Sequence, residues 1–205
     1  MLAGWLASWY DAYTMTPASP RDTRIRILDA ALDLFVEHGF AGATLQQIAD
    51  RLGFTKAALY YHFKSKDDLL AALITPAMAE LDALLARYEV APDTPARRRD
   101  FMREYLDFLL ANRRLIAYTV RDLPTLLAHP SLATGWTERG QRLSTILAGE
   151  DPDFDAQVRF TMVVRGFAAA IAQFPEVDAD DLRDALMGSA RSMLRSRPRP
   201  RTTPA

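Results

Sequence analysis

The sequence contains no cysteine and only nine glycines among its 205 residues. Without cysteine there is no disulfide framework, no thiolate zinc site, no cysteine-ligated iron–sulfur cluster and no cysteine nucleophile. Neither sign of charge is in excess, because 25 lysines and arginines face 26 aspartates and glutamates, giving a net charge of −1. A basic coat over the whole surface is therefore excluded, and any anion-binding surface must be local.

Long hydrophobic runs are also missing. Residues 1–14 are apolar but fall short of the roughly 20 residues that span a bilayer, and no basic residue precedes them as in a secretory signal. We therefore expect a cytoplasmic protein with no membrane partner. Residues 1–19 are expected to form an extension that is either disordered or a short helix. Residues 196–205, which carry prolines and arginines, are expected to form a disordered basic tail.

Apolar residues recur at helical spacing along almost the whole chain, and no stretch shows the sustained alternation of a β-strand. The pattern predicts an all-α protein of about nine helices. They are expected near residues 23–38, 45–52, 56–63, 66–88, 96–111, 113–128, 131–148, 154–174 and 179–195. Pro76 and Pro124 are expected to bend the helices that contain them. We divide the chain into a small N-terminal domain, residues 20–66, and a larger helical domain, residues 67–195.

The most informative stretch, residues 44–66, predicts two short helices joined by a tight turn. Thr44 and the glutamine three residues later match the capping box that starts a helix, and Gly53 supplies the turn. Ala49 is small enough for two helices to cross closely, and Leu59 is placed to plug the second helix onto the first. These residue types at this spacing predict a helix-turn-helix.

The second helix of this motif has an unusual outer face. Lys56, Ala57, Tyr60, Tyr61 and Lys64 are expected to point outward. Tyrosines can donate to phosphates and pack on sugars or thymine methyls, and lysines neutralise phosphate charge. The face therefore favours DNA in the major groove over a merely solvated surface.

The segment from Arg24 to about Leu73 resembles the DNA-binding domain of the tetracycline-repressor (TetR) family. The likeness rests on the Gly39-Phe40 exit, the Thr44 start, the Ile48-Ala49 pair, the Leu52-Gly53 turn, and Leu59-Tyr60-Tyr61-His62-Phe63 with Lys66. The remainder of the chain agrees only in length and helical character. The resemblance implies a homodimeric transcriptional regulator, by default a repressor. It would bind a pseudo-palindromic double-stranded DNA operator and be released by an unknown small-molecule effector.

The resemblance also implies DNA-contact roles. By position, these fall on Thr44, Gln46, Lys56, Ala57, Ala58, Tyr60, Tyr61, His62 and Lys66. Thr44 would cap its helix and touch a phosphate, and Lys66 would hold a phosphate at a helix start. Two alanines stand where a polar base reader often sits, so direct readout would rest on Lys56 and Gln46, with DNA shape carrying more of the specificity.

The family resemblance further implies that the last two helices form a four-helix dimer interface. Small and apolar residues on these helices permit this, and the candidates are Gly166, Ala169, Leu182, Leu186, Ser189 and Met193. The alternative is a seam within one subunit. A twofold dimer would place two recognition helices one turn of DNA apart, ~34 Å.

An effector pocket is expected among the helices between residues 96 and 174. The candidates are Phe101, Tyr105, Phe108, Tyr118, Trp136, Phe160 and Arg165. Residues of these kinds are more often plain core than ligand contacts. Arg121, Asp122 and Arg165 interrupt apolar helices and indicate either a pocket, a solvated face or a structural ion pair.

No enzyme motif is present, whether a phosphate-binding loop, a dinucleotide fingerprint, a zinc-protease helix or a serine nucleophile elbow. His38, His62 and His129 do not have metal-ligand spacing. We therefore expect no catalysis, no metal and no cofactor. The competing hypothesis is a helical protein-interaction module that carries a degenerate helix-turn-helix, which would lack salt-dependent affinity for DNA.

Overall fold

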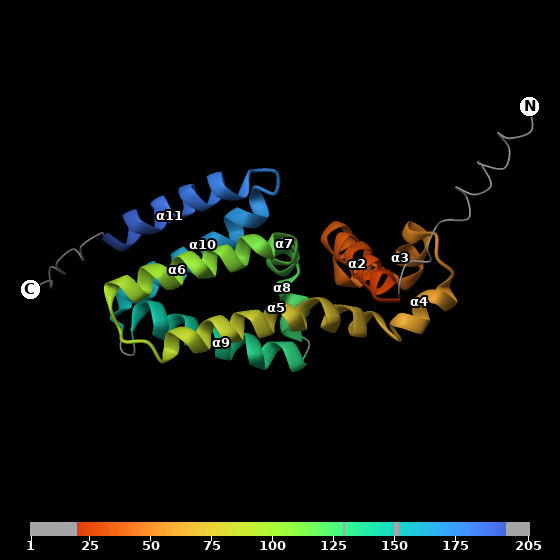
Figure 1. Ribbon diagram of the computed structural model, residues 1–205, viewed down its shortest axis with the longest axis horizontal. Helices are drawn as coiled ribbons and strands as arrows, with labels where there is room; N and C mark the ends of the chain where they lie inside the picture. The colour runs from red at the N-terminus through yellow and green to blue at the C-terminus, as the bar shows by residue number, and fades with distance from the viewer. Residues whose placement is uncertain (1–19, 129, 150–151, 196–205) are drawn as a thin grey trace, which may run out of the picture.

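The computed structural model describes residues 20–128, 130–149 and 152–195, and this part of the chain contains ten helices and no strand. The helices, drawn in Figure 1, are α2 (Pro20–Gly42), α3 (Leu45–Leu52), α4 (Lys56–His62), α5 (Lys66–Glu89), α6 (Pro95–Ala111), α7 (Arg113–Arg121), α8 (Leu123–Ala128), α9 (Pro130–Ala148), α10 (Phe154–Gln173) and α11 (Ala179–Arg195). The predicted all-α class is confirmed. The expectations for residues 1–19 and 196–205 lie outside the described residues.

The first described helix, α2, is longer than predicted and contains a break. It begins at Pro20 and continues to Gly42, but Gly39 has non-helical angles of φ 71° and ψ 168°. The expectation that Gly39 ends the first helical segment is therefore confirmed, because a positive φ is accessible to glycine at little cost. A short second segment follows it and leads to the helix-turn-helix.

The predicted single helix over residues 113–128 is wrong. The chain forms two helices, α7 and α8, and the break falls at Asp122 rather than at Pro124. The Asp122 carboxylate accepts the backbone N–H of Phe40 at 2.7 Å and the hydroxyl of Thr125 at 2.6 Å. These bonds hold Asp122 at the junction and leave Pro124 in the first turn of α8, where a missing N–H costs nothing.

The helices divide into a small group and a body that α5 connects. Helices α2, α3 and α4 lie at one end of an elongated molecule, and α5 runs from them into the body beside α6 and α9 (Figure 1). By length and composition, α5 is the single helix of the described residues that could cross a membrane. Its apolar side chains instead pack inside the protein, namely Leu69, Leu70, Ile74, Ala77, Leu81, Leu84 and Leu85.

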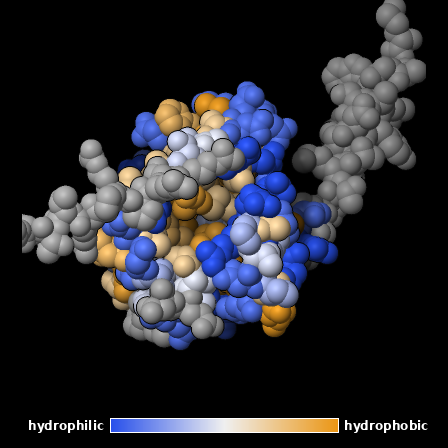
Figure 2. Space-filling view, turned by 90° about the vertical axis from the view of Figure 1, so that its left-hand side faces the viewer, coloured by the Kyte–Doolittle hydropathy of each residue, from blue (hydrophilic) through white to orange (hydrophobic). Residues whose placement is uncertain are grey.

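One hydrophobic cluster joins both groups of helices. Its largest fully buried side chains include Phe35 of α2, Phe101 of α6 and Tyr118 of α7. Viewed from the end of the body away from α4, hydrophobic residues gather around a hollow and hydrophilic residues lie around them (Figure 2). The helix-turn-helix is thus mounted on a continuous core that extends to the far end of the molecule.

Candidate nucleic-acid interface

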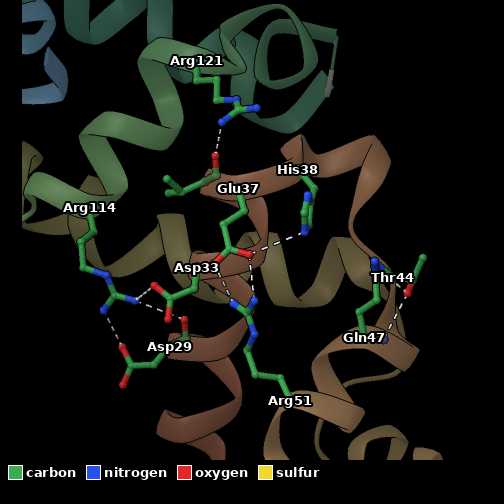
Figure 3. Close-up of polar contacts among 10 residues, drawn as sticks. Asp29, Asp33, Glu37, His38, Thr44, Gln47, Arg51, Arg114 and Arg121 are labelled. Atoms are coloured by element: carbon green, nitrogen blue, oxygen red, sulfur yellow. Dashed lines mark hydrogen bonds and ion pairs between the residues drawn. The ribbon is translucent and has the colours of Figure 1, made fainter.

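The turn between α3 and α4 has the geometry that the sequence predicts. Thr44 Oγ1 accepts the backbone N–H of Gln47 at 3.1 Å, and Gln47 Oε1 accepts the backbone N–H of Thr44 at 2.8 Å, which completes the capping box (Figure 3). Gly53 ends α3 in the left-handed region, at φ 66°. Ala49 and Leu59 are fully buried, so the two helices cross closely and are locked together.

The start of α4 depends on a residue that the sequence analysis missed. Thr55 caps the helix, and its Oγ1 accepts the backbone N–H of Ala58 at 3.2 Å. A threonine just before an expected helix is an N-cap signal and could have identified it. With α4 fixed by this cap and by buried Leu59, its outer side chains have a defined direction.

The outer face of α4 is exposed, as expected. Lys56, Ala57 and Ala58 are exposed, Tyr60 is 43% exposed and Tyr61 is 84% exposed. Tyr61 is thus a large aromatic side chain held in solvent, which is unusual without a partner surface. The face carries no acidic residue, so it can approach a phosphate backbone without repulsion.

Two of the side chains expected to contact DNA bases, Gln46 and Lys56, each contact a residue one helical turn further along their own helix. Gln46 Nε2 donates to Asp50 Oδ1 at 2.6 Å within α3. Lys56 Nζ lies 5.7 Å from the centroid of the Tyr60 ring within α4, at cation–π distance. Half-buried His62 meets the edge of the Tyr61 ring, with centroids 5.2 Å apart. These contacts restrict the side chains before any ligand arrives.

Lys66 does not point to an open anion site. Its ammonium donates to the backbone carbonyls of Phe40 at 2.5 Å and Ala43 at 2.9 Å, and it lies 4.4 Å from the centroid of the Phe40 ring. These contacts satisfy the orphan carbonyls at the end of α2. Because its donors are engaged inside the protein, we omit Lys66 from the proposed DNA contacts and assign it a structural role.

Ion pairs hold α2 against α3 and against the body (Figure 3). Arg51 binds Glu37 through two hydrogen bonds, of 3.0 and 2.8 Å, which lower the pKa of the Glu37 carboxyl. From α7, Arg114 binds the carboxylates of Asp29 and Asp33. Together with Arg121 and Asp122, described next, these contacts fix the helix-turn-helix relative to the body.

The charged residues of α7 act as structural links. Arg121 donates to the carbonyl of Val36, and Asp122 accepts the N–H of Phe40. Neither residue lines the cleft between α5, α8 and α9. The contacts described for this pair are hydrogen bonds to backbone groups and to a hydroxyl rather than the ion pair that the sequence left open, and Arg165 lies on a solvated face of α10.

The predicted pocket residues do not surround one cavity. Phe101, Tyr105 and Phe108 are buried in α6 and form an aromatic row with centroids 6.0 and 6.4 Å apart. Tyr118 is buried against Phe35. Phe160 is half-buried against the core, and Arg165 is exposed. Of the seven candidates, Trp136 borders the cleft between α5, α8 and α9, and four others are buried in the core.

The predicted dimer residues also separate into two kinds. Gly166 and Ala169 of α10 and Ser189 and Met193 of α11 are exposed. Leu182 is buried and Leu186 is packed against the core, so both side chains make packing contacts within one subunit. The sequence could not separate these sets, because both lie on apolar stripes of the same helices.

Within the described residues, no group of three or more histidines, cysteines, aspartates or glutamates is arranged to hold a metal ion.

The geometry of α2 to α4 agrees with the comparison to known families. Residues 27–73 match the family described as bacterial regulatory proteins, tetR family. This segment of the chain is therefore similar to the tetR family of bacterial regulatory proteins. The matched residues extend from α2 through the helix-turn-helix into the first turns of α5, which confirms the resemblance inferred from the sequence.

Curated relatives and solved structures extend this likeness. The chain is 48% identical over 59 residues to TtgW of Pseudomonas putida, an uncharacterized HTH-type transcriptional regulator, covering 29% of this chain and 44% of TtgW. It is 32% identical over 134 residues to RutR, an HTH-type transcriptional regulator of Escherichia coli, covering 56% of this chain and 62% of RutR. Each match thus spans less than two thirds of the relative's own length.

The fold is shared beyond the matched segment. The structure of the ketosteroid transcriptional regulator KstR2 of Mycobacterium tuberculosis superposes with a TM-score of 0.71 at 16% identity. The superposition covers 85% of this chain and 96% of KstR2, so the body shares the fold of that structure.

Proposed function

We propose that this chain is a DNA-binding transcriptional regulator of the TetR family that inserts α4 into the major groove. The observation that carries the proposal is the exposed, acid-free face of α4, on which Tyr61 is 84% exposed. A seven-residue helix at 1.5 Å per residue is ~10 Å long, which suits entry into a groove. As a regulator of transcription in a bacterium, the protein would work in the cytoplasm.

The side chains available for readout indicate a mixed mode of recognition. Lys56 can donate to guanine O6 and N7 or neutralise a phosphate, and Gln46 can bond adenine N6 and N7. Ala57 and Ala58 have no polar atoms and can contact thymine methyl groups. With so few polar readers, we expect sequence-dependent DNA shape to supply part of the specificity.

Exposed small and apolar residues on α10 and α11 support a twofold dimer. On α10 they are Val158, Met162, Gly166 and Ala169, and on α11 they are Ala185, Gly188, Ser189 and Met193. Such stripes let helices approach closely and would form a four-helix interface. Leu182 is excluded because it is buried within the subunit. A dimer would read a pseudo-palindromic operator with half-sites ~34 Å apart.

We further propose that the regulator is a repressor whose operator affinity falls when a small molecule binds the body. Support comes from the continuity of α5, which borders α2 at one end and packs on α6 and α9 at the other. A ligand that changes the packing around α5 therefore has a direct mechanical link to the helix-turn-helix.

The test selects genomic DNA fragments with the purified full-length protein and footprints the tightest binder. We expect a protected pseudo-palindrome and an affinity that falls steeply with salt. Lys56→Ala should lower affinity and reduce the salt slope by about one ion, whereas Arg87→Ala, on the body surface, should change neither. Binding that ignores both sequence and salt would refute the proposal and favour a helical interaction module.

The dimer is tested separately by sedimentation. Met162→Asp places a charge on the 55% exposed side chain at the centre of the α10 stripe and should yield monomers of unchanged helicity. Glu138→Gln, an exposed position of α9, serves as the control. A wild-type protein that sediments as a monomer at micromolar concentration would contradict this part of the proposal.

A further inference from the structure

A cleft opens in the body between α5, α8 and α9. Its walls include Ile74, Met78 and Asp82 of α5, Leu126 of α8, and Trp136 and Arg139 of α9, and its volume is about 230 Å³. An apolar cavity of ~150 Å³ accommodates benzene. The cleft therefore has room for one ring or a short aliphatic chain together with one polar group.

The polar wall of the cleft belongs to a row of ion pairs that joins α5 to α9. Arg139 binds Asp82 through two hydrogen bonds, Nε to Oδ1 at 3.0 Å and Nη2 to Oδ2 at 2.5 Å. Arg142 donates to Asp82 Oδ1 at 2.8 Å and binds Glu89 through two more hydrogen bonds, of 2.6 and 3.0 Å. Asp82 is thus shared between two guanidinium groups.

The two partners differ in how many ion pairs they make: Asp82 pairs with two arginines, whereas Arg139 pairs with Asp82. This difference indicates whether the cleft favours an anionic or a cationic ligand. If an anionic ligand replaces Asp82 as the partner of Arg139, Asp82 remains paired with Arg142, so no charged side chain is left unpaired. If a cationic ligand pairs with Asp82 in place of Arg139, Arg139 loses the one acidic partner it has among the described residues. Leaving a partly buried charge unpaired is costly, whereas exchanging one carboxylate for another is nearly neutral. The network therefore favours an anionic group over a cationic one.

The glycine one turn before Arg139 makes room for its guanidinium. A Cβ at Gly135 would overlap Arg139 Nη1, so the guanidinium would have to shift to admit a larger residue. The guanidinium therefore rests against the bare backbone of α9. Trp136, the next residue, contributes an aromatic side chain to the same cleft. The guanidinium of Arg139 beside apolar and aromatic side chains suits a ligand with a carboxylate attached to an apolar group.

We propose that this cleft binds a small apolar carboxylic acid as its carboxylate. The carboxylate would pair with Arg139, and the ring or chain would lie against Met78, Leu126 and Trp136. The inference rests on the proposed function in one respect only: such an acid would be the effector of the regulator. Binding itself requires no DNA, so the two proposals can fail independently.

The first experiment is calorimetry on the purified full-length protein without DNA. Phenylacetate and hexanoate are the acid probes, and phenylacetamide and hexanamide are neutral probes of matched shape. We expect saturable 1:1 binding per chain of at least one acid, with its amide at least about tenfold weaker. Absence of acid binding at millimolar concentration, or equal binding of acid and amide, would overturn the proposal.

Variants of the ion-pair row provide the second experiment. Arg139→Gln should weaken acid binding about tenfold or more. Asp82→Asn should strengthen it, because Arg139 no longer has a competing carboxylate. Arg142→Gln should weaken it, because an acid that takes Arg139 then leaves Asp82 unpaired. Arg87→Gln, which removes an exposed arginine of α5 that pairs with Glu104, is the matched control and should change nothing. Asp82→Asn that binds the acid no better than wild type would contradict the asymmetry argument.

Gly135→Ala separates ligand binding from a structural role. Alanine is the better helix former, so a merely structural position would gain stability. The added Cβ must displace the Arg139 guanidinium, so we expect weaker acid binding from a chain that is folded and no less stable. Unchanged acid affinity in Gly135→Ala would refute the assigned position of the carboxylate.

Discussion

The helix-turn-helix and the body differ in the range of the contacts that set their geometry. In the helix-turn-helix, the caps Thr44–Gln47 and Thr55–Ala58 join residues three positions apart. In the body, Arg139 reaches Asp82 across 57 positions and Arg183 reaches Asp107 across 76. Local contacts can be encoded by a short motif, whereas distant ones depend on how the helices are assembled. The family match accordingly covers residues 27–73 and not the body.

The difference also bears on what each region can do. The helix-turn-helix is held by two caps and a buried leucine, which suits a surface that must match the same DNA groove repeatedly. The body is held by an aromatic row and by ion pairs between helices, and these are the contacts that the proposed effector would redistribute. The contacts of Arg114, Arg121 and Asp122 with α2 are where such a change would reach the DNA-binding end.

The largest expected effect is on the body. Phe101→Ala removes a fully buried ring from the aromatic row and should lower the free energy of unfolding by about 3–5 kcal/mol. Chemical denaturation followed by circular dichroism measures it. Phe154→Ala, the same change at a 65% exposed ring of α10, is the control and should cost little. Equal losses in the two variants would mean that the row does not hold the body together.

A similar change in the helix-turn-helix should separate the two regions. Leu59→Ala removes the buried plug between α3 and α4 and should cost about 2–5 kcal/mol. Because the contact is local, we expect DNA affinity to be lost while the body stays folded and the oligomeric state is kept. Gel filtration and DNA titration, with Leu127→Ala at a 45% exposed position as control, test this. Retained DNA binding would show that the plug is dispensable.

The link between the regions should have a smaller effect. Asp122→Ala leaves the N–H of Phe40 and the hydroxyl of Thr125 without their acceptor and should cost about 1–3 kcal/mol. Hydrogen exchange should increase at the end of α2 and at the start of α8, but not in α11. A uniform increase along the chain would indicate global destabilisation rather than a loosened junction.

The smallest effect is the acid dependence of the ion-pair row. Hydrogen bonds from Arg142 hold the pKa of Glu89 below its ordinary value of 4.5. A lowered pKa in the folded state means that this pair contributes stability above pH 4.5 and loses it as pH falls through the folded pKa. Glu89→Gln should therefore be slightly less stable than wild type at neutral pH. The difference in free energy of unfolding between the two proteins should disappear in acid.

Urea midpoints at several pH values measure this gap. Glu176→Gln, at an exposed position between α10 and α11, is the matched control and should follow the wild type throughout. A gap between Glu89→Gln and wild type that widens as pH falls would show the opposite sign and contradict the assignment.

The sequence predicted the helix-turn-helix closely because its signals are local. The limits of α3 agree residue for residue, and those of α4 differ by one at its end. Thr55 was missed although its signal is equally local. Lys66 was assigned to a phosphate because the motif alone does not show that the carbonyls at the end of α2 lie within its reach.

In the body, the sequence predicted helices but not their partners. A periodic apolar stripe shows that a face is buried, not whether it is buried within the subunit or against a second copy. Leu182 and Met193 lie on the same helix, yet the first is buried and the second is 41% exposed. Likewise, aromatic residues such as Tyr105 fit a pocket or a core equally well until their neighbours are known.

By itself, the sequence determined the all-α class, the helix-turn-helix and the exposed face of α4. Hydrophobic periodicity, helix caps and turn glycines act over a few residues, so they can be recognised from the sequence alone. Tertiary structure alone decided the break at Asp122, the internal role of Lys66 and the shared carboxylate of Asp82 beside the cleft. Each of these depends on groups that are distant in sequence and adjacent in space, and their meeting is a property of the packed helices.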